Sequence, residues 1–282
     1  MKLFTYKVIN FIFIKLFEIY YSKKYKKPKF SCMLENSLAK LNGYDLKFTY
    51  HDDIRLYEVT EGNISRSFSN PERGFWLYRS GVSVRGRFLF ESYCLQNINF
   101  TTGDTIIDCG ANSGDLTLQL QSMSLQLNYV AFEPNPADFQ VLKQNVTMPN
   151  RTLLNNALGE KSGELDFYVN TTEADSSLIK PQNYSKLIKS KVITLDEYFD
   201  GNNLGNVRLL KLEAEGFEPE ILLGARRALQ KIEFVAVDGG YERGIECEQT
   251  LTTVANILFE SGFEMIDIYF PWYRALFRKK LN

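Results

Sequence analysis

Residues 103–118 read GDTIIDCGANSGDLTL, and the architecture of the chain can be worked out from this stretch. Its apolar, β-prone run at 105–107 predicts a strand, its small residues at 110–114 predict a tight turn, and a helix is expected to begin at Asp115. Because Gly110 has no Cβ, the backbone can turn sharply there and approach a ligand closely. The free N–H groups of the helix start would face the same ligand.

The rest of the chain continues this alternation of strands and helices. Such alternation is typical of a parallel sheet, so we predict an α/β fold with a doubly wound, mostly parallel sheet over residues 101–282. The polar residues 171–190 predict a mobile loop. Strands are expected at 129–132, 151–155, 164–169, 207–212, 234–237 and 264–269, and helices at 136–145, 219–230 and 246–261.

Acidic residues end several of these strands, and the carboxyl ends of parallel strands share one edge of a sheet. Glu133 follows the glycine turn by about 20 residues, where doubly wound folds bind ribose hydroxyls. The glycines are spaced GxxxG and not GxGxxG, which argues against a nicotinamide dinucleotide. Like charges at one edge need a compensating cation. The acids are Asp108, Glu133, Glu213, Glu215 and Asp238.

Three motifs resemble those of the FkbM-type methyltransferases, class I enzymes that use S-adenosylmethionine. They are DCGANSG at 108–114, FEPN at 132–135 and KLEAEG at 211–216, within a resemblance that covers roughly residues 66–263. The resemblance implies a seven-stranded Rossmann-like sheet and S-adenosyl-L-methionine as the cofactor. The family has Asp where this chain has Glu213. The cofactor contacts implied are Asp108, Gly110, Ala111, Asn112, Gly114, Glu133 and Pro134, joined by Asn156 and Ala157 unless these two form a plain turn.

Methyl transfer to a hydroxyl needs in-line positioning and a proton acceptor. Glu213 is the first choice for the acceptor, then Asp238, then Glu215, although Glu215 could instead cap the following helix. Glu213 and Asp238 also occupy the strand ends at which catechol-type O-methyltransferases hold a divalent metal, so a metal is an open alternative. Lys211 could be an electrostatic partner of this edge or a member of an ion pair.

The acceptor contacts come from loops around the same edge. The resemblance implies them for Ser176 and Ser177. Tyr241, Glu242 and Arg243 either contact the acceptor or are solvated loop residues. Arg85, Arg87 and Tyr93, beside an expected helix at 88–95, are further candidates in a region that caps the cofactor in the resembled family.

The leading interpretation is therefore an S-adenosylmethionine-dependent O-methyltransferase. The resemblance suggests a sugar hydroxyl of a glycan, a lipid-linked saccharide or a natural product as the acceptor. Two alternatives are a nicotinamide-dependent oxidoreductase and a catalytically degenerate nucleoside-binding module. The single histidine, His51, nearly excludes a histidine-based triad or metal site, and the four scattered cysteines indicate reduced thiols in a cytoplasmic protein.

The N-terminal part has a different character. Up to Lys29 it holds eight lysines and one acid, Glu18, whereas the net charge of the 282-residue chain is −1, which gives no general attraction to nucleic acid. Residues 1–30 predict a basic amphipathic segment, too short in its apolar run to span a bilayer and without a signal-peptide cleavage pattern. It could lie on an anionic membrane face, pack as a helix on another surface, or be disordered. Residues 31–100 are expected to form a cap region with a hairpin near 48–59 and Asp52-Asp53 in its turn.

Overall fold

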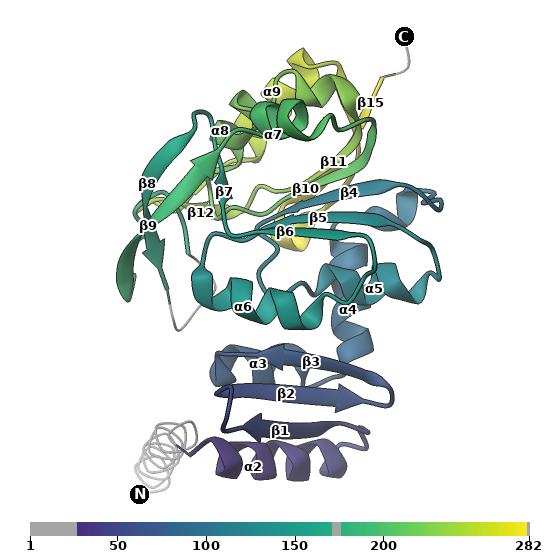
Figure 1. Ribbon diagram of the computed structural model, residues 1–282, viewed down its shortest axis with the longest axis vertical. Helices are drawn as coiled ribbons and strands as arrows, with labels where there is room; N and C mark the ends of the chain where they lie inside the picture. Colours follow the sequence, from purple (N-terminus) through teal and green to yellow (C-terminus); the bar gives the residue numbers. More distant parts are fainter. Residues whose placement is uncertain (1–26, 171–175, 281–282) are drawn as a thin grey trace, which may run out of the picture. The chain divides into compact units, whose positions relative to one another are not determined.

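The computed structural model describes residues 27–170 and 176–280 (Figure 1). The chain divides into two compact units, Met1–Val82 and Ser83–Asn282. Residues 83–100, which the sequence placed in the cap region, thus belong with the second unit. Most of the predicted basic segment, residues 1–26, lies outside the described residues.

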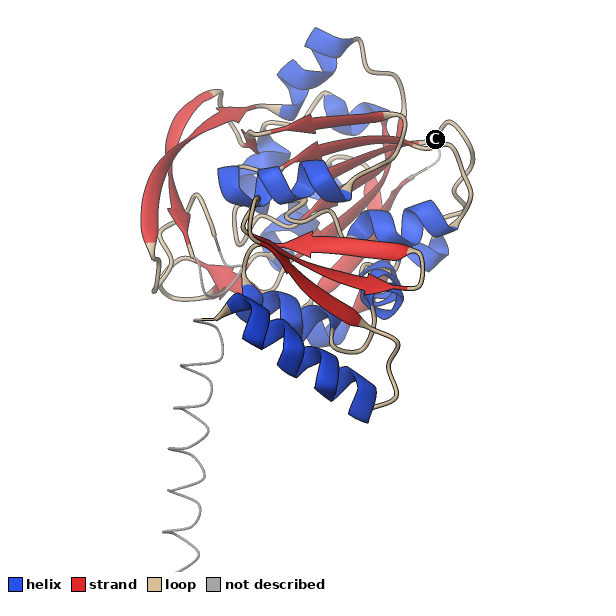
Figure 2. Cartoon of the chain, turned by 60° about the horizontal axis from the view of Figure 1, so that its bottom comes forward, coloured by secondary structure: helices blue, strands red, loops and turns tan. Residues whose placement is uncertain are grey.

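From residue 27 onward, where the structure describes it, the N-terminal unit is a three-stranded antiparallel sheet with two helices (Figure 2). The predicted hairpin is confirmed, and a second hairpin adds a strand that the sequence analysis did not anticipate. Asn36 fastens the first helix to the sheet, since its side chain hydrogen-bonds both the N–H and the C=O of Phe48, at 2.6 and 3.0 Å. The elements are α2 (Pro28–Leu41), β1 (Lys47–His51), β2 (Leu56–Glu61), β3 (Ile64–Phe68) and α3 (Pro71–Tyr78).

The second unit is built on a seven-stranded sheet in the order β14-β15-β11-β10-β4-β5-β6. Neighbours from β11 to β6 are parallel, and β15 runs antiparallel between β11 and β14, so the predicted doubly wound, mostly parallel sheet is confirmed. Its strands are β4 (Thr105–Cys109), β5 (Asn128–Phe132), β6 (Arg151–Leu154), β10 (Val207–Leu212), β11 (Ile232–Asp238), β14 (Phe263–Tyr269) and β15 (Arg274–Lys279).

Helices cover both faces of this sheet, because its central strands are apolar on both sides. One face packs against α4 (Val82–Ser92), α5 (Leu116–Ser122) and α6 (Pro136–Asn145). The other packs against α7 (Leu195–Asn202), α8 (Glu218–Leu223) and α9 (Leu251–Glu260), as Figure 1 shows. The sequence order along the sheet reverses at β4, whose neighbours are β5 and β10.

Several predicted elements differ from the structure. The helix expected at 246–261 begins only at Leu251, because Glu248–Gln249 form strand β13 and pair with β12 (Tyr241–Arg243). The helix expected at 219–230 ends at Leu223, and a separate 3-10 turn, η2, follows at Ala228–Lys231.

The polar loop expected at 171–190 is also partly wrong. Residues 171–175 lie outside the described residues, but β9 (Lys186–Ile193) begins inside the predicted loop and pairs from Lys186 to Val192 with β8 (Gly163–Val169). Strand β9 also pairs with the short β7 (Ala157–Leu158). The lysines of β9 face solvent because the strand is only half-buried, so the composition of this range resembles that of a loop. The remaining 3-10 turns are η1 (Leu95–Asn97) and η3 (Phe270–Trp272).

Within the described ranges, no helix is both long enough and apolar enough to cross a bilayer. All four cysteines are free thiols, and three of them are buried. Burial raises the pKa of Cys109, inside the glycine turn, well above its usual value, so this thiol stays protonated.

Candidate functional site

The acidic ends of β4, β10 and β11 meet two basic side chains at the carboxyl edge of the sheet. The register places Asp108 beside Lys211 and Asp238 beside Arg274, so each pair projects from neighbouring strands on the same face. Ligands of open α/β sheets bind at this edge, next to the point where the strand order reverses. In this sheet that point lies between β4 and β10.

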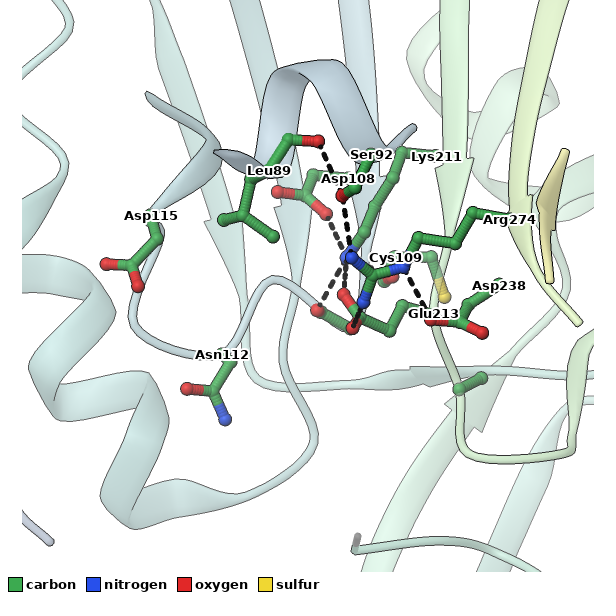
Figure 3. A network of polar contacts seen from close by, with 12 residues as sticks. Leu89, Ser92, Asp108, Cys109, Asn112, Asp115, Lys211, Glu213, Asp238 and Arg274 are labelled. Atoms are coloured by element: carbon green, nitrogen blue, oxygen red, sulfur yellow. Dashed lines mark hydrogen bonds and ion pairs between the residues drawn. The ribbon is translucent and has the colours of Figure 1, made fainter. Parts of the chain in front are cut away.

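Lys211 and Arg274 join the three carboxylates into one network (Figure 3). Lys211 Nζ lies 3.0 Å from Asp108 Oδ1 and 2.8 Å from Glu213 Oε2. Arg274 donates to Asp238 Oδ2 at 2.7 Å through Nε and to Glu213 Oε1 at 3.0 Å through Nη2. Its Nη1 donates to Ser92 Oγ at 2.7 Å. Two side chains of the chain itself therefore compensate part of the negative charge at this edge.

Arg274 is the charged residue of this network that could not be identified from the sequence, and Ser92 was likewise not predicted. Arg274 begins β15, a strand not expected from the sequence because its apolar run, Ala275–Phe277, is only three residues long. Tyr93, from the segment after α4, lies beneath it, with 4.3 Å between the ring centroid and the guanidinium carbon. Such cation–π contacts stabilise a buried guanidinium.

The two cations change what Glu213 can do. Burial raises its pKa, but Lys211 and Arg274 outweigh burial and hold the pKa well below its usual range. A carboxylate with so low a pKa stays ionised but accepts a proton weakly. Glu213 is thus suited to hold Lys211 and Arg274 in place. It is less suited to the role of proton acceptor that the sequence predicted for it.

Asp108 is almost fully buried, and both of its oxygens are engaged. The Tyr129 hydroxyl donates to Oδ2 at 2.6 Å, and Lys211 pairs with Oδ1. This arrangement ties β4 to β5 and β10. A direct contact of Asp108 with the cofactor remains a prediction.

The glycine turn after β4 needs its glycines for backbone conformation and for packing within the protein. Gly110 has φ = +71°, and a Cβ on it would lie 1.8 Å from the backbone oxygen of Glu213. Gly114 has φ = +81°, and its Cβ would lie 2.7 Å from Val146 Cγ2. Both glycines are therefore required for packing, and the close approach of a ligand at Gly110 stays a prediction. Asn112, between them, also has a positive φ of +48°.

Glu133 ends β5 with its carboxylate turned to this glycine turn. Its two oxygens accept hydrogen bonds from the backbone N–H groups of Asn112 and Asn135, both at 2.8 Å. Burial, with a contribution from Asp138, raises its pKa to about 8. Each carboxylate oxygen accepts about two hydrogen bonds, so each keeps one position for a further donor. The carboxylate can therefore receive the two hydroxyls of a vicinal diol.

A second acidic group surrounds the turn after β10. Glu218 is fully buried and accepts hydrogen bonds from the amides of Ala214 and Gly216 and from the Thr250 hydroxyl. These bonds hold the turn before α8, whose N-cap residue, Phe217, makes no side-chain capping hydrogen bond. Burial raises the pKa of Glu218 to about 7.

Glu242 lies on β12, just past the end of β11. A Cβ on Gly240 would lie 3.2 Å from Asp238 Oδ1 and 3.6 Å from Glu242 Oε1, so both carboxylates border this glycine. Burial, followed by the charges of Asp238 and Glu213, raises the pKa of Glu242 to about 8. Of the acids at this edge, Glu242 combines partial exposure with a pKa close to neutral pH.

Most of the predicted acceptor contacts have partners within the protein. The Ser177 hydroxyl donates to the backbone carbonyl of Glu215 at 2.9 Å, and Ser176 Oγ accepts from the backbone N–H of Asn170 at 3.0 Å. Arg243 forms a two-pronged ion pair with Glu220, at 2.7 and 3.0 Å. These side chains hold loops together, and acceptor binding by them stays a prediction.

The remaining predicted contacts have different surroundings. Arg85 pairs with Asp115 at 3.0 Å and Arg87 is exposed. Tyr241 is 58% exposed beside Glu242. Asn156 and Ala157, the predicted adenine contacts, immediately follow Asn155, whose side chain donates to the backbone oxygen of Glu133 at 2.8 Å.

The predicted metal ligands face a guanidinium. Glu213 and Asp238 each give an oxygen to Arg274, and in the part of the chain that the structure describes no group of three or more His, Cys, Asp or Glu side chains is placed to hold a metal ion. This donor set does not fit a divalent metal.

Comparison with known proteins places these features in a family. The chain is 31% identical over 137 residues to the hexuronic acid methyltransferase AglP of Haloferax volcanii, across 48% of this chain and 55% of AglP, so the match spans little more than half of that relative. It is 20% identical to the 2-O-methyltransferase NoeI of Sinorhizobium fredii, across 57% of this chain and 72% of NoeI. A crystal structure of a methyltransferase FkbM from Methylobacillus flagellatus KT matches with a TM-score of 0.44 and 16% identity, across 72% of this chain and 56% of that one.

A family model, the methyltransferase FkbM domain, matches residues 108–268, from Asp108 at the end of β4 to β14. This range is more than half of the chain and contains the glycine turn, Glu133, Lys211, Glu213 and Asp238. The protein belongs to the FkbM methyltransferase-domain family.

Proposed function

We propose that the protein transfers a methyl group from S-adenosylmethionine to a hydroxyl oxygen of a saccharide. The observation that carries this proposal is the buried Glu133 carboxylate, which accepts the 2.8 Å bond from the backbone amide of Asn112 in the turn after β4 and can accept one further hydrogen bond at each oxygen. The names of two relatives, a hexuronic acid methyltransferase and a 2-O-methyltransferase, support a sugar acceptor.

The chain's residues fit this cofactor. Glu133 would receive the ribose hydroxyls, the turn from Gly110 to Gly114 would border the rest of the nucleoside, and Asn156 and Ala157 would border the base. When bound, the cofactor supplies a methyl group on a sulfonium, which becomes a neutral thioether as the acceptor oxygen takes the methyl. The network around Glu213 carries three carboxylates, Asp108, Glu213 and Asp238, against two cations, and this excess negative charge favours a cationic ligand.

The proton of the acceptor hydroxyl then needs a base at the same edge. Glu242 is better suited than Glu213, because an efficient general base has a pKa near the working pH. Asp238 is 2% exposed and bonded to Arg274 and to the Gly240 amide, so it is less accessible. We assign to Glu242 the uptake of the proton, and to Glu213 and Asp238 the placement of Arg274.

Calorimetric titration tests cofactor binding. We expect S-adenosylmethionine to bind and NAD not to bind. Glu133→Gln should weaken binding by about 1.5–3 kcal/mol, the range for hydrogen bonds to a charged group. Because diol donors favour the ionised carboxylate, affinity should rise with pH up to about 8. Binding of NAD alone would favour an oxidoreductase, and cofactor binding without methyl transfer to a panel of saccharides would favour a degenerate binding module.

A kinetic comparison tests the base. Glu242→Gln should lower kcat by about 10²–10⁴-fold, the usual contribution of a general base, and should remove the rise of kcat through pH 8. Glu246→Gln, an exposed residue of the same loop, is the matched control and should leave kcat unchanged. A Glu242→Gln enzyme that keeps the wild-type pH profile would contradict the assignment.

We further propose that the N-terminal segment contacts an anionic membrane surface at the cytoplasmic face, where a lipid-linked saccharide would be accessible. Helix α2 supports this, because it exposes Phe30, Met33 and Leu41 beside Lys29 and Lys40. Co-sedimentation with phosphatidylglycerol vesicles, but not with phosphatidylcholine vesicles, is the expected result. Equal recovery with both vesicle types would contradict this location.

A further inference from the structure

Exposed aromatic side chains gather beside the acidic edge of the second unit. Trp272, the last residue of η3, is 46% exposed, and Tyr273, which connects η3 to β15, is 37% exposed. Tyr241, 58% exposed, follows Asp238 by three residues. Large aromatic side chains left in solvent next to a polar site commonly mark a ligand surface.

The residues that carry the three rings lie on adjacent turns, and the Trp272 ring itself packs against Phe88 of α4, with 6.3 Å between the ring centroids. The Tyr241 and Tyr273 rings are 5.2 Å apart, edge to face. The backbone oxygen of Trp272 would lie 3.6 Å from a Cβ on Gly240, and the Tyr273 carbonyl accepts a hydrogen bond from the Gly239 amide at 3.2 Å. The turn that carries Trp272 and Tyr273 therefore lies against the two glycines that separate Asp238 from Tyr241.

This surface also contacts the network. The Trp272 ring centroid lies 5.7 Å from the guanidinium carbon of Arg274, which holds both Asp238 and Glu213. Glu242 is the neighbour of Tyr241 in the chain. The aromatic surface thus borders the carboxylates without an intervening element.

Tyr273 adopts a left-handed backbone conformation as the C-cap of η3. Its φ is +53°, which costs a bulky residue on the order of 1–3 kcal/mol. The hydrogen bond from Gly239 and the pairing of Arg274 with Asp238 hold it there. A glycine or asparagine would adopt this conformation with less strain, but neither offers a ring.

We propose that Tyr241, Trp272 and Tyr273 form a platform on which a pyranose ring of the acceptor lies, with its hydroxyl edge toward Glu242 and Asp238. A pyranose has an apolar C–H face and a polar rim, which matches aromatic rings bordered by carboxylates and a guanidinium. This inference rests on the proposed saccharide acceptor and names the surface that binds it.

Saturation-transfer NMR on the full chain without cofactor tests the platform directly. The probes are methyl β-D-glucopyranoside, its glucuronide analogue, and sorbitol, an open-chain polyol that has no ring face. We expect transfer to the ring protons of at least one pyranoside and none to sorbitol. Trp272→Leu and Tyr241→Ala should each reduce the transfer about tenfold, whereas Trp76→Leu, which removes the other exposed tryptophan from α3, should not.

Equal transfer to sorbitol, or transfer unchanged by Trp272→Leu, would overturn the platform. Circular dichroism of each variant verifies folding. Methyl transfer to a saccharide with an unchanged acceptor KM in Trp272→Leu would refute the platform and leave the proposed function intact. Pyranoside binding that needs Trp272, in a protein that binds no S-adenosylmethionine, would refute the proposed function alone.

Discussion

Arg274 determines the electrostatics of the site at the scale of single residues. Its guanidinium contacts Asp238, Glu213 and Ser92 and lies against the ring of Tyr93. Burial alone would lower its pKa, but Tyr93 and the two carboxylates raise it, so the charge is retained. Without this cation, Asp238 would be a buried carboxylate with only the Gly240 amide as a donor, among the residues that the structure describes.

Replacing Arg274 should therefore be far more costly than replacing an arginine at the surface. Arg274→Met should destabilise the fold by about 3–5 kcal/mol, because removing one partner of a buried ion pair leaves the other uncompensated. Arg278→Met, on the same strand and paired with Glu264 at the surface, should cost about 0–1 kcal/mol. Urea unfolding followed by circular dichroism measures both. Equal losses would show that the network contributes little to stability.

At the scale of elements, the turn after β4 and the turn after β10 form one unit. The amide of Glu213 donates to the Cys109 carbonyl at 3.1 Å, Lys211 Nζ donates to the Gly110 carbonyl at 3.0 Å, and Gly110 lies against the backbone of Glu213. The position of the proposed cofactor turn is thus coupled to the position of the acidic edge. A change in one should move the other.

Substitution of Gly110 tests this coupling. Gly110→Ala combines a positive φ with a Cβ at 1.8 Å from a backbone oxygen, and we expect it to destabilise the protein and weaken cofactor binding together. Gly103→Ala, at φ = +95° with nothing within 4 Å of the added Cβ, isolates the backbone strain, which costs about 1–2 kcal/mol. Thermal unfolding and calorimetry compare the two variants. A Gly110→Ala protein no less stable than Gly103→Ala would contradict the close contact.

At the scale of the whole molecule, several buried or half-buried acids have pKa values above the usual 4.5 of a glutamate. The pKa is about 7 for Glu218 and about 8 for Glu133 and Glu242, in each case chiefly because of burial. Between these values and 4.5 the folded state binds more protons than the unfolded chain, so stability falls as the pH rises. The lowered pKa of Glu213 changes the free energy of unfolding only near and below pH 4.5, so it does not oppose this decrease.

The free energy of unfolding should therefore decrease from about pH 5 to about pH 8. Glu218→Gln preserves the shape of the side chain and removes its titration, so the decrease should become shallower, on the order of 2 kcal/mol over this range at 1.36 kcal/mol per pKa unit. Glu260→Gln, exposed on α9, is the control. Urea unfolding at several pH values gives the slopes. A variant with the wild-type slope would show that Glu218 is ionised in the folded state at pH 5.

The sequence by itself determined the sheet and its acidic edge. Strands β4, β5, β10 and β11 are short apolar runs that end in polar residues, as buried parallel strands do, and parallel strands necessarily bring their carboxyl ends together. The Glu133 position, the glycine turn and the strand-end acids follow from this local pattern. No long-range pairing has to be known to find them.

Only the tertiary structure decided which charges compensate the edge. Asp238 and Arg274 lie 36 residues apart, and their contact depends on the antiparallel register of β15, a strand with too short an apolar run to predict. The same register brings Trp272 and Tyr273 to Tyr241 and places Tyr93 beneath Arg274. Local periodicity encodes which face of a strand is buried, but it does not encode which distant strand becomes its neighbour. The chemistry of this edge depends on that neighbour.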